Sequence, residues 1–97
     1  MAVVMIMHWP EIAVDQYEEA RRRVDWEGDQ PEGGLTHVSW FEDGLHVIEM
    51  WESPEDFERF GNERLMPIVK GEMGVESDPD VKFAPLHALF IPEAARV

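Results

Sequence analysis

The sequence predicts an α+β fold with the element order β-α-β-β-α-β. This order is typical of a ferredoxin-like, four-stranded antiparallel sheet with both helices on one face. Apolar runs at residues 3–8 and 81–91 indicate buried strands. Two further apolar runs flank Asp43-Gly44, which is a hairpin signal. Two helical patterns separate these strands, and residues 1–97 suit a single domain.

The first strand is expected at Val3–His8, where every residue before the histidine is apolar, and Pro10 ends it. A helix is expected from about Ala13 to Asp25, because acidic residues come early and arginines late, which suits the helix dipole. Glycines and a proline then indicate a loop over residues 27–34. One helix face repeats at helical spacing and should be buried: Ala13, Tyr17, Ala20 and Val24.

The second helix has a strong start signal. Ser53 can cap it, Pro54 suits its first turn, and Asp56 can close a capping box. Pro67 should kink the helix or end its first segment near Leu65. The residues expected to be buried are Phe57, Phe60, Leu65 and Ile68.

The first and last expected strands indicate a homodimer. An antiparallel sheet with one solvated face alternates apolar and polar residues, but residues 3–8 and 81–91 do not alternate. Both helices are expected on one face, so something else must cover the second face. A second copy of the chain is the simplest cover.

Composition narrows the class of partner. The chain has 21 acidic and 8 basic residues, a formal charge of −13, which disfavours nucleic acid and anionic membrane surfaces. No cysteine is present, so thiol chemistry is excluded and a cytoplasmic location is expected. The seven-residue apolar opening is too short for a signal peptide or a membrane span. No metal-binding histidine spacing or phosphate-binding glycine motif occurs, and no metal or cofactor is expected.

The hairpin has two possible registers. A two-residue turn at Asp43-Gly44 places His37 and Glu49 on opposite faces, whereas a three-residue loop over residues 42–44 places them opposite each other on one face. We favour the second register because it separates polar from apolar residues better. One face then carries Leu35, His37, Ser39, Glu49 and Trp51, and the other carries Thr36, Val38, Trp40, His46, Ile48 and Met50.

The run GLHVIEMWESPEDFERF resembles the third strand and second helix of dimeric α/β-barrel proteins, the superfamily of the antibiotic biosynthesis monooxygenases. The resemblance rests on Trp51-Glu52-Ser53 followed by Phe57 and Phe60. It implies that two sheets face each other in a dimer and that each subunit holds a mostly apolar pocket between sheet and helices. Short bacterial members are similar through His37, Arg64-Leu65-Met66-Pro67 and Pro85-Leu86-His87.

This superfamily includes cofactor-free oxygenases, haem-degrading enzymes, polyketide cyclases, isomerases and proteins without known activity. The oxygenases and haem-degrading members often carry a histidine in the second helix. Phe60-Gly61-Asn62 stands there in this chain, which disfavours haem degradation.

The candidate function is cofactor-independent chemistry on a hydrophobic aromatic or polyketide-like molecule: oxygenation, cyclisation or isomerisation. His37 would act as the base, Glu49 would orient its imidazole, and His87 would polarise a carbonyl. The alternatives remain a structural His37–Glu49 pair and a non-catalytic homodimer that binds a metabolite or supports another protein. The candidate substrate-binding residues are Ser39, Met50, Trp51, Phe57 and Phe60.

Overall fold

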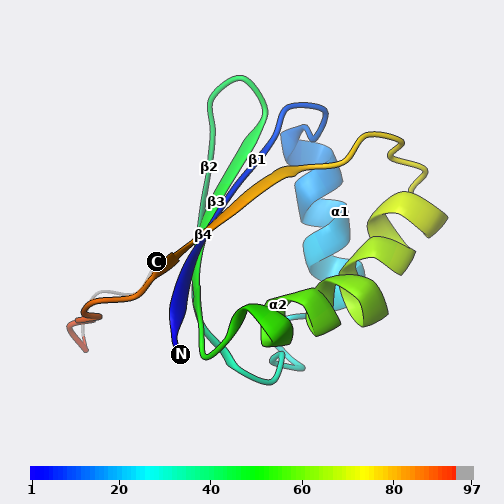
Figure 1. Cartoon of the computed structure of the whole chain (residues 1–97). Coiled ribbons are helices and arrows are strands. Elements are labelled where there is room, and N and C mark those ends of the chain that lie inside the picture. Colours follow the sequence, from blue (N-terminus) through cyan, green and yellow to red (C-terminus); the bar gives the residue numbers. More distant parts are fainter. Residues whose placement is uncertain (94–97) are drawn as a thin grey trace.

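The computed structural model describes residues 1–93 and has the expected α+β architecture (Figure 1). Four antiparallel strands form one sheet in the order β2-β3-β1-β4, and the helices lie on one side of it. The elements are β1 (Val3–Trp9), α1 (Val14–Val24), β2 (Gly34–Phe41), β3 (Leu45–Trp51), α2 (Pro54–Phe60), the π-helical segments η1 (Gly61–Leu65) and η2 (Pro67–Glu72), and β4 (Asp80–Pro85).

The sheet has two very different faces. Alternate side chains of a strand point to opposite faces, so Met5 lies under the helices and is fully buried, while its neighbour Ile6 is 43% exposed. β3 alternates in the same way, with Leu45 and Trp51 inside. An apolar run that does not alternate in sequence therefore alternates in burial within the single chain.

The hairpin adopts the three-residue loop, as predicted. Phe41 lies opposite Leu45, and Gly44 has a positive φ of 92°. A Cβ on Gly44 would lie 2.4 Å from the Pro10 backbone, so glycine is required there for space as well as for conformation. The neighbouring Asp43 is also left-handed, with φ 55°, which the sequence pattern did not indicate.

The other end of the hairpin differs from the predicted register. Gly34 lies opposite Trp51, where Leu35 was expected, because an irregularity between Gly34 and Thr36 shifts the pairing. The carbonyl of Gly33, at φ 85°, accepts a hydrogen bond from the Glu52 amide at 2.8 Å. This contact extends the pairing into the preceding loop.

Helix α1 buries three of its four predicted residues. Tyr17, Ala20 and Val24 are buried, but Ala13 is the exposed N-cap residue, and its amide donates to the Gln16 side chain at 2.8 Å. Ile12, just before the helix, fills the inner position instead and is 4% exposed.

The second helical segment begins as predicted and then widens. Ser53 Oγ accepts a hydrogen bond from the Asp56 amide at 3.2 Å, while the Asp56 carboxylate pairs with Arg59 rather than closing a capping box. η1 ends at Leu65, as expected, but Met66 keeps helical backbone angles and η2 begins at Pro67, so the helical path continues to Glu72. π-helical turns have a longer hydrogen-bond spacing and change the inward face, so Val69 is buried where Ile68 was expected.

The last strand is shorter than predicted, ending at Pro85 rather than at Ile91. β1 begins at Val3, which pairs with Pro85, and one further bond joins the Leu86 amide to the Ala2 carbonyl at 3.0 Å. Residues 87–93 belong to no strand and lead away from the sheet (Figure 1). Within residues 1–93, no helix is both long and apolar enough to span a membrane.

Candidate functional site

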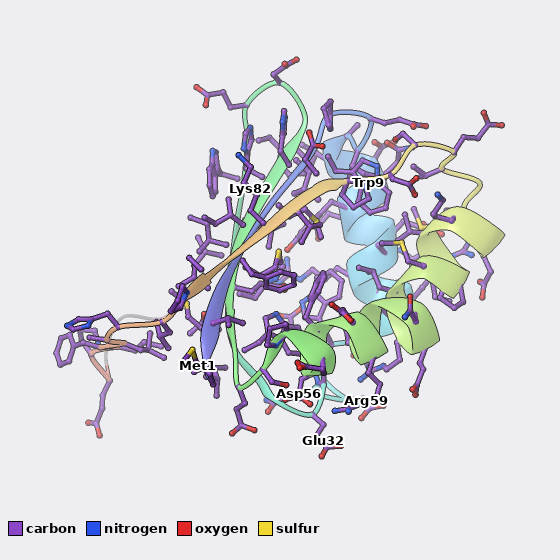
Figure 2. All side chains as sticks on the ribbon, in the orientation of Figure 1. Met1, Trp9, Glu32, Asp56, Arg59 and Lys82 are labelled. Atoms are coloured by element: carbon purple, nitrogen blue, oxygen red, sulfur yellow. The ribbon has the colours of Figure 1, made fainter. Side chains whose placement is uncertain are left out.

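A cavity of about 280 Å³ lies between the inner face of the sheet and the helices. Figure 2 shows Trp9 on this helix-covered side and Lys82 on the opposite side of the sheet. Most of the wall is aromatic or aliphatic, as in ligand pockets generally. Its aromatic residues, apart from His37, are Trp9, Tyr17, Trp26, Trp51, Phe57 and Phe60.

His37 and Glu49 meet in this wall, as the favoured register predicted. They lie opposite each other on β2 and β3, and His37 Nδ1 is 2.5 Å from Glu49 Oε2. Trp51, two residues along the same strand, donates its indole N–H to Glu49 Oε1 at 2.9 Å. Glu49 is only 8% exposed, so these two bonds satisfy a carboxylate that would be costly to bury alone.

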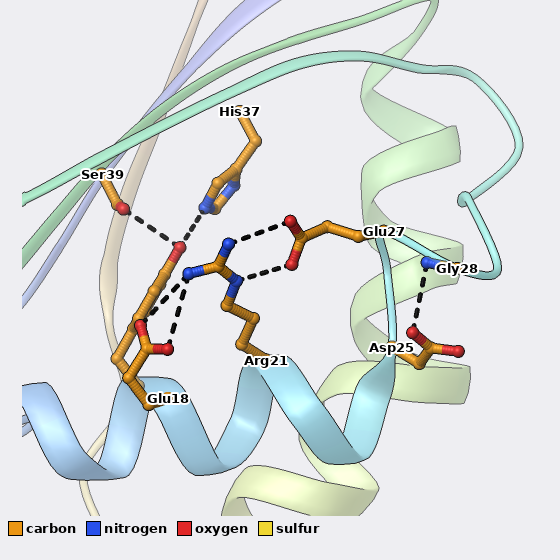
Figure 3. A network of polar contacts seen from close by, with 8 residues as sticks. Glu18, Arg21, Asp25, Glu27, Gly28, His37 and Ser39 are labelled. Atoms are coloured by element: carbon orange, nitrogen blue, oxygen red, sulfur yellow. Dashed lines mark hydrogen bonds and ion pairs between the residues drawn. The ribbon is translucent and has the colours of Figure 1, made fainter. Parts of the chain in front are cut away.

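Tyr17 extends this pair into a chain of three residues. Its hydroxyl lies 2.7 Å from His37 Nε2 and accepts a hydrogen bond from Ser39 Oγ at 3.0 Å (Figure 3). Tyr17 is 8% exposed, lines the cavity and belongs to α1, which lies across from the hairpin.

The hydrogen bonds of this three-residue series can all donate in one direction, from Tyr17 through His37 to Glu49. When Glu49 is a carboxylate and His37 is neutral, Nδ1 donates to Glu49 Oε2 and Nε2 accepts from the Tyr17 hydroxyl. Both ring nitrogens of His37 are therefore occupied. A proton from the cavity can reach the imidazole through the Tyr17 oxygen.

Burial is the main influence on the tyrosine. It raises the pKa of the Tyr17 hydroxyl above its ordinary value of 10.0, and the Ser39 hydrogen bond acts in the opposite direction. Tyr17 therefore keeps its proton at neutral pH and can donate it to His37.

The charged residues beside the cavity are already paired. Arg21 binds Glu27 through Nε–Oε1 and Nη2–Oε2 contacts of 2.5 and 3.0 Å and also contacts Glu18 (Figure 3). The Arg21 hydrogen bond lowers the pKa of the Glu27 carboxyl. In the described part of the chain, the cavity lining includes Glu27 and Glu49 but neither lysine nor arginine.

The structure brings five of the eight candidate site residues to the cavity. Ser39 lies just behind the wall and reaches it through Tyr17. Met50 lies on the opposite face of the sheet, where its sulfur accepts from Thr36 Oγ1 at 2.7 Å. His87 follows β4, is exposed and does not line the cavity. The five that line it are His37, Glu49, Trp51, Phe57 and Phe60.

Sequence reasoning missed Tyr17 as a site residue. It was assigned to the buried face of α1 by helical spacing alone, which is correct but does not reveal what its hydroxyl contacts. The available signal was that it is the single tyrosine of the chain, on a buried face where its hydroxyl needs a partner.

Metal binding has no geometric support in the described residues. Across residues 1–93, no three histidine, aspartate or glutamate side chains gather as a set that could hold a metal ion.

No protein-family model and no curated protein sequence matches this chain. Solved structures do. SnoaB, a cofactor-independent oxygenase from Streptomyces nogalater, is 16% identical over 91% of this chain and 93% of its own, with a TM-score of 0.57. An antibiotic biosynthesis monooxygenase is 16% identical over 91% of this chain and 100% of its own, with a TM-score of 0.56. This chain has the fold of the antibiotic biosynthesis monooxygenases.

A third structure with this fold contains a ligand. It is the monooxygenase ActVA-Orf6 of Streptomyces coelicolor in complex with nanaomycin D. It is 16% identical over 95% of this chain and 92% of its own, with a TM-score of 0.57. At these identities the likeness establishes the fold, whereas function depends on the residues of the site.

Proposed function

We propose that this protein binds a hydrophobic, aromatic or polyketide-like molecule in the cavity and catalyses its oxygenation, cyclisation or isomerisation without a cofactor. The observation that carries the proposal is the Tyr17–His37–Glu49 chain, which opens onto an apolar cavity. A base, a residue that orients it and an apolar space for the ligand are parts that proton-transfer catalysis uses.

The proposed chemistry begins with removal of a ligand proton. The ligand X–H bond breaks, its proton moves to the Tyr17 oxygen, and the Tyr17 proton moves to His37 Nε2. The products are the ligand anion and an imidazolium held beside the Glu49 carboxylate, so charge and protons balance. The proton returns along the same route after the anion has reacted.

The structural neighbours support this reading. SnoaB is a cofactor-independent oxygenase, and ActVA-Orf6 is a monooxygenase in complex with nanaomycin D. We therefore include oxygenation, in which O₂ oxidises the ligand anion, among the proposed reactions.

We also propose that the protein works as a homodimer whose two sheets face each other. The face of the sheet away from the helices carries exposed apolar side chains, and contiguous patches of this kind mark association surfaces. Its exposed members include Ile6, Val38 and Trp40, which are 43%, 56% and 40% exposed.

Anthrone is a suitable first substrate for the test. Loss of a proton gives a readily oxidised phenolate, and the net reaction is anthrone plus O₂ to anthraquinone plus water. An oxygen electrode and the absorbance of anthraquinone follow both sides of this equation. The protein should consume oxygen and form anthraquinone faster than buffer alone.

His37→Gln tests the base. Glutamine can keep hydrogen bonds to both neighbours but does not take up a proton near neutral pH, so turnover should fall by about 100-fold or more. Arg22→Gln, on the exposed side of α1, is the matched control and should keep full activity. Unchanged turnover in His37→Gln would rule out this mechanism.

The alternative is a non-catalytic homodimer that binds a metabolite. The short His37–Glu49 contact is also compatible with a purely structural pair. Binding of anthrone without turnover, together with a large loss of thermal stability in His37→Gln, would favour that function.

A further inference from the structure

We propose that the Tyr17 oxygen determines ligand specificity: it accepts a hydrogen bond from a hydroxyl on an uncharged ring ligand, and the cavity rejects anionic ligands such as carboxylates. This inference rests on the proposed function, because it concerns the same cavity. It identifies a recognition atom and a charge requirement for the ligand.

The direction of the hydrogen bonds decides what the Tyr17 oxygen can accept. When His37 is neutral with its proton on Nδ1, that proton is donated to Glu49 and the Tyr17 hydroxyl donates to Nε2. Tyr17 therefore presents an oxygen that accepts hydrogen bonds, with Ser39 already donating to it from behind the cavity wall. A ligand hydroxyl can donate to this oxygen, whereas an ether or ketone group at the same place cannot.

The charges of the cavity lining disfavour anionic ligands. Glu27 and Glu49 line the cavity, and its described lining contains no cation. Two arginines lie beside the lining: Arg21 already binds the Glu27 and Glu18 carboxylates, and Arg64 lies over the Phe60 ring and donates to the Val24 carbonyl. An anionic ligand would lose its hydration beside these like charges without gaining a partner, which is costly in an apolar site.

The volume of the cavity limits the size of the ligand. A cavity of about 280 Å³ is just below the usual range for ligand pockets, roughly 300–1,000 Å³. Trp26 and Phe60 are among the flat side chains in the lining and suit fused rings. An uncharged ligand of two or three fused rings with one free hydroxyl meets the requirements for hydrogen bonding, charge and size.

Three naphthalenes that share one ring system test this inference on the full chain. Isothermal titration calorimetry at neutral pH would compare 2-naphthol, 2-methoxynaphthalene and 2-naphthoate. We expect 2-naphthol to bind about 10-fold more tightly than the methyl ether, the difference for one well-made hydrogen bond. 2-Naphthoate should bind more weakly than both.

Tyr17→Phe removes the accepting oxygen and keeps the ring. In this variant the affinity for 2-naphthol should fall to that of 2-methoxynaphthalene, while the affinity for the ether stays the same. Arg22→Gln, on the exposed side of α1 and outside the cavity lining, is the control. It should keep the preference for naphthol.

Glu27→Gln tests the charge requirement separately. Removal of this carboxylate should strengthen binding of 2-naphthoate several-fold and leave 2-naphthol nearly unchanged. If Tyr17→Phe does not fold, the wild-type comparison of naphthol with its methyl ether still decides the first half of the inference.

The outcomes separate this inference from the proposed function. Equal binding of 2-naphthol and its methyl ether, or tightest binding of 2-naphthoate, would overturn the specificity assigned to Tyr17 and leave a small-molecule cavity in place. Failure of all three compounds to bind would overturn both.

Discussion

The two faces of the sheet differ sharply in how far their side chains are buried. Met5 and Ile6 are consecutive on β1, yet one is fully buried and the other is 43% exposed. The helices cover the first face and enclose a cavity against it. The second face also carries apolar side chains, including Ile6, Val38 and Trp40, but no helix or strand within residues 1–93 covers it. Apolar sequence therefore marks both faces for burial, while the single chain supplies a cover for only one.

The polar residues of the two faces also behave differently. On the inner face, His37 joins Tyr17 and Glu49 and borders the cavity. On the outer face, His8 and His46 stack with ring centroids 4.1 Å apart. Each bonds through Nε2 to a carbonyl of the hairpin loop, at 2.8 and 2.7 Å. Histidines on neighbouring strands thus take different roles according to the face on which they lie.

The largest expected effect is on the inner face. Trp51 is 2% exposed, packs against Phe57 and Phe60, and holds Glu49 through its indole N–H. Trp51→Ala should lower the free energy of unfolding by about 3–5 kcal/mol, because it leaves a cavity and removes a donor from a buried carboxylate. Urea denaturation at low protein concentration would measure this loss.

Trp40→Ala is the matched change on the outer face, where the side chain is 40% exposed. Its cost at low protein concentration should be less than half that of Trp51→Ala. Equal losses from the two substitutions would contradict the contrast between the faces.

The second prediction concerns association through the outer face. Light scattering of the wild-type protein at micromolar concentration should give twice the 11.2 kDa mass of one chain. Ile6→Glu places a carboxylate in the proposed interface and should weaken the dimer at least ~10-fold, since an unpaired buried charge costs well over 1.4 kcal/mol. Glu72→Gln, on the helix side, should leave the mass unchanged.

A wild-type protein that remains a single chain at this concentration would refute the proposed dimer. A dimer that persists in Ile6→Glu would show that another surface joins the subunits.

The smallest predicted effect is the ionisation of Tyr17. Burial raises the pKa of its hydroxyl, so the folded protein holds this proton more tightly than the unfolded chain. This contribution to stability should be complete below the ordinary pKa of 10.0 and should be lost as pH rises through the folded pKa. Because Tyr17 is the single tyrosine, ultraviolet difference absorption of the phenolate reports it directly.

The midpoint of this titration should lie above 10.0 in the folded protein and near 10.0 in denaturant. A folded midpoint at or below the denatured one would mean that the Tyr17 oxygen is more open to solvent or more strongly bonded than the structure indicates. Tyr17→Phe provides the spectroscopic blank.

Local sequence patterns predicted much of the fold. Of the two hydrogen-bonded contacts that His37 makes, they predicted the one with Glu49 but not the one with Tyr17. Strand periodicity and the Asp43-Gly44 signal led to the correct register for residues 36–41 of the hairpin, and this register alone set His37 opposite Glu49. The residues at which strands end were harder to predict. β4 ends at Pro85 because its partner strand begins at Val3, a property of the pairing that the apolar run to Ile91 does not contain.

The sequence of this protein carries its element order, its hairpin register and the apolar character of both sheet faces, because these depend on neighbours within a few residues. Contacts between distant segments added the rest. The packing of α1 across the hairpin brings Tyr17 to His37, twenty residues away, and the wide turns after Phe60 turn Val69 inward. Such contacts depend on how whole elements pack, and a residue pattern within one element does not encode the distance to another.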